Sequence, residues 1–138
     1  MIDRYSNPEI ARIWSLEEKY AIWLEVELAV CRAWQRRGLF SAAELLEIEQ
    51  KAAFDVARIL EIEETVQHDV IAFLTNVKEH IGPAGRWVHY GLTSSDLGDT
   101  ALCLQLVRSV DIITRRLTAL MDVVREAALR YKDQVMVG

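Results

Sequence analysis

Polar side chains gather in the segment WVHYGLTSSDLGDT, residues 87–100, between two long helical patterns. Thr93 and Asp96 have the spacing of a helix capping box, so the simplest interpretation is that this segment only starts a helix. Ser94 and Ser95 supply two hydroxyls beyond the one that a cap needs. Because the free N–H groups of a helix start attract negative charge, the segment is also a candidate site for a carboxylate or a phosphate. Both interpretations stay open here.

Three histidines add to the possible chemistry. His68 lies between Gln67 and Asp69 at a predicted helix start, where a nearby carboxylate can hold the imidazole in one tautomer. It can equally be a surface or capping residue. His89 lies in a loop with aromatic residues and a glycine, which suits either a pocket wall or ordinary packing. His80 lies in the last turn of a helix, where a cation stabilises the helix end, so we expect it to be structural.

Arg4 and Tyr5 lie in a short segment before the first predicted helix. The planar fork of an arginine suits a phosphate group, although solvated charge is the simpler interpretation. The sequence contains no Ser-His-Asp triad, glycine-rich phosphate loop or paired-cysteine redox motif, and its cysteines lack the spacing of a zinc site. The sequence therefore offers no zinc site and none of these catalytic or phosphate-binding motifs.

The composition is that of one helical globular domain, with 138 residues, 51% hydrophobic residues and only 2 prolines. The 21 acidic residues outnumber the 16 basic ones, so the net charge of −5 argues against a nucleic-acid partner. No apolar run approaches the roughly 18 residues of a membrane span. Cys31 and Cys103 lie in helical patterns without a signal peptide, so we expect buried free thiols in the cytoplasm.

The elements that carry these residues all have helical periodicity, which predicts an all-α fold. Polar capping residues mark where the helices start. Gly38 and Gly82 mark where two of them stop. Glu27 is assigned to the wet face of the helix over residues 16–37, although it intrudes on the apolar stripe. The predicted caps are Asn7 before Pro8, Ser15 with Glu18, Ser41 with Glu44, and Asp55, and the helix over residues 65–81 begins with the residues Thr65 to Asp69.

From Ser95 onward the apolar residues alternate steps of three and four, which is the pattern of a heptad seam. A single helix to about Gln134 has about 40 residues and runs about 60 Å, whereas a domain of this size has a radius of gyration of only roughly 14 Å. The helix must therefore protrude and be covered by other chains or by further sequence. The seam consists of Cys103, Leu106, Val110, Ile113, Leu117, Leu120, Val124, Ala127 and Tyr131.

These patterns predict an N-terminal helical domain over residues 1–94 and the first part of a long bundle helix over residues 95–138. The apolar end VMVG is expected to be a cut within a larger fold.

Four stretches in this order resemble the N-terminal part of the adenylosuccinate lyase family, in the fumarase and aspartase superfamily. The stretches are MIDRY, LEIEETVQHDVIAF, WVHYGLTSSDLGDTAL and VMVG. The resemblance implies a small helical domain that leads into a central helix bundle, assembled as a homotetramer. It also implies cleavage of adenylosuccinate to AMP and fumarate, and of SAICAR to AICAR and fumarate, in purine biosynthesis and without a cofactor. The reaction is a β-elimination.

The resemblance also assigns roles to individual residues. Arg4 and Tyr5 match the pair that holds the nucleotide phosphate. Gln67, His68 and Asp69 match the triplet at the substrate, with His68 in a catalytic role near the reacting groups.

Thr93 and Ser94 match the hydroxyl pair on the dicarboxylate side, and His89 belongs to the same motif. The histidine that serves as general acid and the serine that serves as base follow beyond VMVG in the family. We therefore expect this chain alone to be inactive. The alternative interpretation is a helical oligomerisation or adaptor module that binds no ligand, in which the polar loop only caps the long helix.

Overall fold

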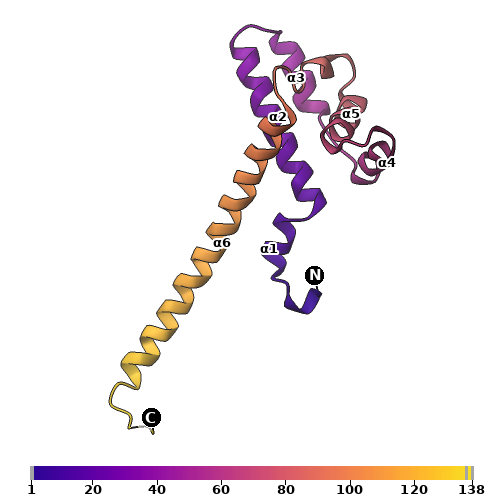
Figure 1. Cartoon of the computed structure of the whole chain (residues 1–138). Helices are drawn as coiled ribbons and strands as arrows, with labels where there is room; N and C mark the ends of the chain where they lie inside the picture. The colour runs from indigo at the N-terminus through magenta and orange to yellow at the C-terminus, as the bar shows by residue number, and fades with distance from the viewer. Residues whose placement is uncertain (1, 136, 138) are drawn as a thin grey trace.

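The computed structural model describes residues 2–135 and residue 137, and within them it contains helices and no strand, which confirms the prediction of an all-α fold (Figure 1). None of the described helices is long and apolar enough to cross a membrane. The elements in chain order are the 3₁₀ helix η1 (Asp3–Tyr5), α1 (Pro8–Ile13), α2 (Leu16–Arg36), α3 (Ala42–Lys51), α4 (Val56–Val66), α5 (Asp69–Ile81), the 3₁₀ helix η2 (Pro83–Trp87) and α6 (Ser94–Arg130).

Side-chain caps start the helices close to where the sequence predicts them. The box of Ser41 and Glu44 is complete, because the Ser41 hydroxyl accepts from the Glu44 N–H at 3.2 Å and the Glu44 carboxylate accepts from the Ser41 N–H at 3.0 Å. The box predicted for Ser15 is only half formed: its hydroxyl accepts from the Glu18 N–H at 3.2 Å. The Glu18 carboxylate instead accepts from Arg108 at 3.1 Å, since a charged donor binds it more strongly.

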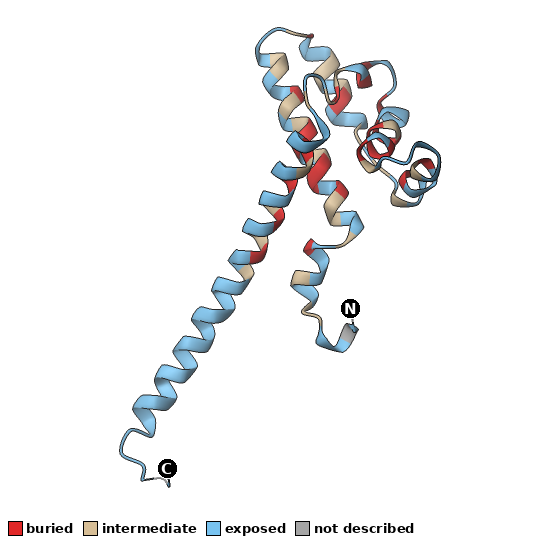
Figure 2. Cartoon of the chain, in the orientation of Figure 1, coloured by how far each residue is buried: buried red, intermediate tan, exposed pale blue. Residues whose placement is uncertain are grey.

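An aromatic cluster forms the centre of the core, where α2 packs against α5. The rings of Tyr20 and Phe73 are stacked with centroids 5.6 Å apart, and Trp23 meets Phe73 edge-on at 5.4 Å. Phe73 is 0% exposed and Tyr20 only 1%. Figure 2 shows the buried residues concentrated in α2, α5 and the first half of α6. This cluster fixes the position of α5 relative to α2.

Helix α6 leaves the core about halfway along its length, as the prediction of a protruding helix requires (Figures 1 and 2). Its buried residues end at Ser109, and every residue over 113–130 is exposed. The helix ends at Arg130, four residues before the predicted Gln134, because Tyr131 departs from helical geometry with a φ of −107° and a ψ of 12°. Helix ends fray where nothing packs on them.

Cys31 is buried as predicted, and burial raises the pKa of its thiol to about 11. The prediction is wrong for Cys103, which is exposed. It lies two positions from both Ala101 and Gln105, which are buried, and a step of two residues along a helix points to the opposite side. The predicted domain boundary between residues 94 and 95 stays a prediction. Leu97, at the start of α6, belongs to the same core as residues before the boundary.

Replacing Phe73 with Ala is expected to lower the free energy of unfolding by about 3–5 kcal/mol, because the change opens a cavity among packed rings. Urea unfolding followed by circular dichroism measures the loss. Ile71→Ala is the matched control, because Ile71 lies on the same helix but is 47% exposed. Equal losses for the two variants would contradict the assignment of the core.

Candidate functional site

The polar loop reaches α6 through a complete capping box. The Thr93 hydroxyl accepts from the Asp96 N–H at 3.4 Å, and the Asp96 carboxylate accepts from the Thr93 N–H at 2.7 Å and from its hydroxyl at 3.0 Å. These bonds, the backbone one first, lower the pKa of Asp96. Thr93, Ser94 and Ser95 are all exposed. The cap is therefore real, and it leaves the Ser94 and Ser95 hydroxyls on the surface.

His89 is held by a carboxylate from the middle of α2. Glu27 is 1% exposed, and its two oxygens meet the His89 backbone N–H at 2.8 Å and Nδ1 at 2.6 Å. His89 itself has a φ of 67°, which non-glycine residues rarely adopt. The prediction that Glu27 lies on the wet face is wrong. Its place within an apolar stripe was the sequence signal for burial. A buried carboxylate needs hydrogen-bond donors, and His89 supplies them.

His68 is the N-cap of α5, and its side chain is 47% exposed. The Ile71 N–H points at its Nδ1 from 3.5 Å, and the nearest Asp69 oxygen is 3.8 Å from the same nitrogen. Gln67 belongs to the end of α4 rather than to the start of α5. It is left-handed, with a φ of 53°, and its side-chain amide donates to the Glu64 carbonyl at 2.7 Å. The turn exposes the imidazole at the junction of two helices.

Asp69 is tied to α2 by an ion pair that the sequence did not reveal. Its carboxylate lies 3.1 Å from Nζ of Lys19. The same ammonium lies over the Trp23 ring, 4.4 Å from its centroid, which fixes the lysine against the aromatic core. No local signal marks this contact, because the partners are separated by 50 positions in the chain.

Arg4 and Tyr5 lie in η1 and are exposed. The Arg4 guanidinium donates to the Tyr5 hydroxyl at 3.1 Å and lies 4.9 Å from the centroid of its ring. Both side chains thus form one surface pair.

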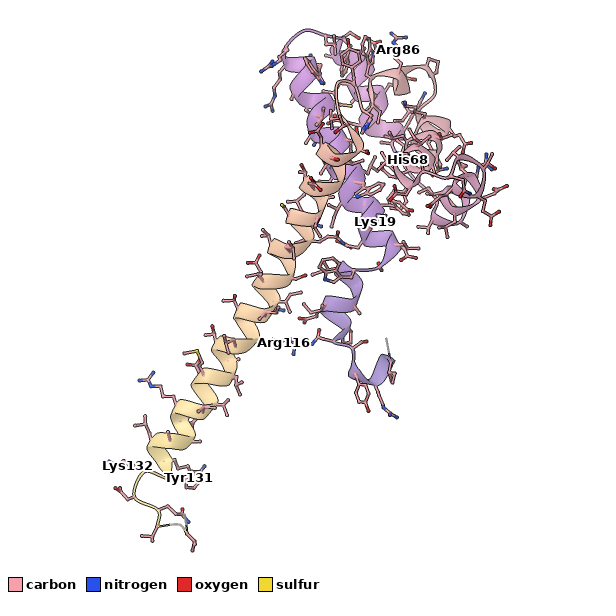
Figure 3. All side chains as sticks on the ribbon, viewed as in Figure 1. Lys19, His68, Arg86, Arg116, Tyr131 and Lys132 are labelled. Atoms are coloured by element: carbon pink, nitrogen blue, oxygen red, sulfur yellow. The ribbon has the colours of Figure 1, made fainter. Side chains whose placement is uncertain are left out.

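The predicted site residues form three groups: the Arg4 pair, the Gln67–Asp69 triplet and the loop with His89, Thr93 and Ser94. Among residues 2–135, no hydrogen bond or ion pair joins one group to another. Figure 1 shows η1 beyond the free end of α1, away from the start of α6, and Figure 3 shows His68 beside α5. No cluster of three or more His, Cys, Asp or Glu side chains there is suited to a metal ion. The chain alone therefore leaves the groups apart.

A hollow of 580 Å³ lies beside the polar loop, between α2 and the first turns of α6. Its walls include the small side chains of Ala29 and Ala33, with Leu92 from the loop and Asp96 and Thr100 from α6. A mostly apolar recess with a few polar groups is typical of a ligand or packing surface. The hollow could not be predicted from the sequence, since its lining residues come from separate helices.

Glu44 anchors the element that leads into the polar loop. Its carboxylate accepts from Nε1 of Trp87 at 2.9 Å and from Arg86 at 2.6 Å, in addition to its bonds with Ser41. The hydrogen bond from Trp87, followed by those from Ser41, lowers the pKa of Glu44 from 4.5 to about 2. One side chain thus caps α3 and holds η2 on it.

Known proteins resemble this chain over nearly its whole length. A family model described as Lyase matches residues 3–138. Curated adenylosuccinate lyases are 52% identical over 138 residues in Synechocystis, 44% over 138 in Bacillus subtilis and 41% over 141 in Aquifex aeolicus. The matches cover all of this chain and 32% of each relative. The crystal structure of a fumarate lyase from Mesorhizobium sp. BNC1 matches with a TM-score of 0.89 and 25% identity, over 96% of this chain and 32% of that one.

The lowered pKa of Glu44 predicts a specific acid sensitivity. A carboxylate whose folded pKa is depressed stabilises the fold above its unfolded pKa of 4.5, and this contribution disappears as the pH falls toward about 2. The urea midpoints of the wild type and Glu44→Gln should therefore differ most at neutral pH and converge below pH 4.5. Glu47→Gln is the control, because it removes a partly exposed carboxylate from the same helix that pairs only locally, with Lys51 one turn away. A constant gap between wild type and Glu44→Gln across pH would refute the assignment.

Proposed function

The chain belongs to the lyase family, and we propose on that premise that it is the N-terminal part of an adenylosuccinate lyase. Such an enzyme cleaves adenylosuccinate to AMP and fumarate, and SAICAR to AICAR and fumarate. The single observation that carries the proposal is the 52% identity to the adenylosuccinate lyase of Synechocystis, over the whole of this chain. The chain spans 32% of the length of that relative. The rest of the enzyme is then needed for turnover.

The proposed residues divide according to the two ends of the substrate. Arg4 and Tyr5 hold the phosphate, because the planar fork of a guanidinium suits its oxygens. Thr93 and Ser94 hold a carboxylate at the electropositive start of α6. Their exposure supports these roles, since neither pair is covered by the rest of the chain.

His68 acts at the reacting groups. In a β-elimination, a base removes a proton from the carbon next to a carboxylate, and an acid protonates the departing nitrogen. The exposed imidazole at the α4–α5 junction can hold or move a proton there, with Gln67 and Asp69 on either side. Lys19 keeps Asp69 in place. The general acid and the base of the full reaction come from other segments, and donors aimed at the developing charge lower its barrier.

The exposed half of α6 supports a proposal about assembly. Apolar residues of the predicted seam stay open to solvent in the single chain, among them Ile113, Leu117 and Leu120 at 53–58% exposure. A stripe of this length is covered in a bundle of α6 helices, and we assign the intact enzyme to a homotetramer. Packing of chains side by side also brings the separate residue groups of different copies within reach of one substrate. Cytoplasmic localisation belongs to the same proposal.

A second function has support from the same stripe. An adaptor module would need the seam of α6 and its cap, and nothing else in the chain. Fumarate release by the completed enzyme separates the two functions, because an adaptor has no reaction to restore.

The activity can be tested by joining residues 1–138 to the remaining part of the Synechocystis relative. We expect this chimaera to release fumarate from adenylosuccinate, whereas the 138-residue chain alone should show none above background. Replacing His68 with Gln in the chimaera should lower kcat by about 100-fold or more. His80→Gln is the control, since the His80 ring contacts the Asn76 carbonyl of its own helix. Its kcat should stay within about twofold of the wild type. A folded but inactive chimaera would refute the proposed function.

The seam can be tested by a charge at its centre. Leu117→Asp should dissociate the assembled chains, because a charge buried between helices costs several kcal/mol. Sedimentation velocity measures the change. Thr118→Asp adds the same charge one position away from the seam and should leave the assembly intact. An unchanged sedimentation coefficient for Leu117→Asp would rule out this interface.

A further inference from the structure

In the part of the chain that the structure describes, Glu27 is the one charged residue that is buried, with an exposure of 1%. It lies in the middle of α2 with Trp23, Val26 and Cys31 buried nearby along the same helix. A carboxylate in such a place is costly unless donors satisfy it, and an apolar residue would pack there at lower cost. Its presence therefore calls for a reason beyond packing.

Both partners of this carboxylate belong to one residue. Oε2 accepts from the His89 backbone N–H at 2.8 Å, and Oε1 lies 2.6 Å from Nδ1 of the same residue. An ionised carboxylate only accepts hydrogen bonds, so Nδ1 must carry the proton of this contact. The pair fixes the ring orientation and leaves Nε2 as the nitrogen available for other contacts.

The geometry also links His89 to the start of α6. The side chain of His89 is 16% exposed, so it reaches the surface while Glu27 does not. The Leu92 backbone N–H donates to the His89 carbonyl at 3.3 Å, so the loop turns at His89 and reaches Thr93, the N-cap of α6, directly after Leu92. A second bond from α2, from Nε1 of Trp34 to the Tyr90 carbonyl at 2.9 Å, holds the same loop without touching His89.

We propose that Glu27 is a positioning residue, which fixes the Nδ1–H tautomer of His89 and presents Nε2 to a substrate at the start of α6. This inference rests on the proposed function only where it names the substrate. Anchoring of the loop is a lesser role, because the Trp34 bond already provides it. The two roles make different predictions for variants that keep the loop in place.

Two-bond ¹H–¹⁵N correlation spectra of the imidazoles in the 138-residue chain test the first part of the proposal, that Glu27 fixes the tautomer of His89. In the wild type, His89 should show a protonated Nδ1. In Glu27→Gln, the amide oxygen can still accept from the backbone N–H while the amide group donates to Nδ1, so the proton should move to Nε2. A protonated Nε2 with a bare Nδ1 in the wild type would overturn the proposal, and this measurement needs no variant to fold.

Activity in the chimaera with the Synechocystis relative tests the second part of the proposal, that His89 presents Nε2 to the substrate. Glu27→Gln should lower kcat at least about tenfold while KM changes by less than about threefold. Trp34→Phe is the matched control, since it removes the other bond between α2 and the loop and should leave kcat within about twofold. Equal losses of kcat in both variants, or an unchanged kcat in Glu27→Gln, would show that Glu27 only anchors the loop. An inactive wild-type chimaera would count against the proposed function, and the imidazole spectra would then decide the role of Glu27 by themselves.

Discussion

The packing of α2 on two sides is the constraint on which the other elements depend. Tyr20 and Trp23 of α2 pack against Phe73 of α5. The same helix also packs against α6, and it contacts α1, α3 and α4. Lys19 joins this helix to Asp69, and Glu27 joins it to His89. Two of the three groups of candidate site residues are thus held by side chains of one helix. A shift of α2 in the core would move both groups together.

Local signals in the sequence predicted most of the fold. Ser41, Asp55 and Thr93 cap the helices that their spacing indicates, because a cap involves residues only a few positions apart. Gly38 has the positive φ of 80° that a helix stop requires. The heptad pattern likewise indicated that α6 runs beyond the domain. These are features whose physical cause lies within one or two turns of chain.

Long-range contacts could not be derived in the same way. Burial of Glu27 depends on a loop 62 positions further along the chain, and the pairing of Lys19 with Asp69 spans 50 positions. Exposure of Cys103 depends on which side of α6 meets α2. For the site, residue types indicated the chemistry of Arg4, His68 and Thr93, but nothing in their spacing states where the folded chain places them. A single chain leaves them in separate regions, which is understandable if other segments complete the site.

The bare half of α6 also has a consequence for folding. Over residues 113–130 the helix has no buried side chain, and helices in water owe most of their stability to packing rather than to backbone propensity. The two halves should therefore differ in amide protection, with slow exchange on the turns that touch α2 and rapid opening farther out. In the proposed assembly, ordering of the outer half would accompany association, so the chains would complete their secondary structure as they come together.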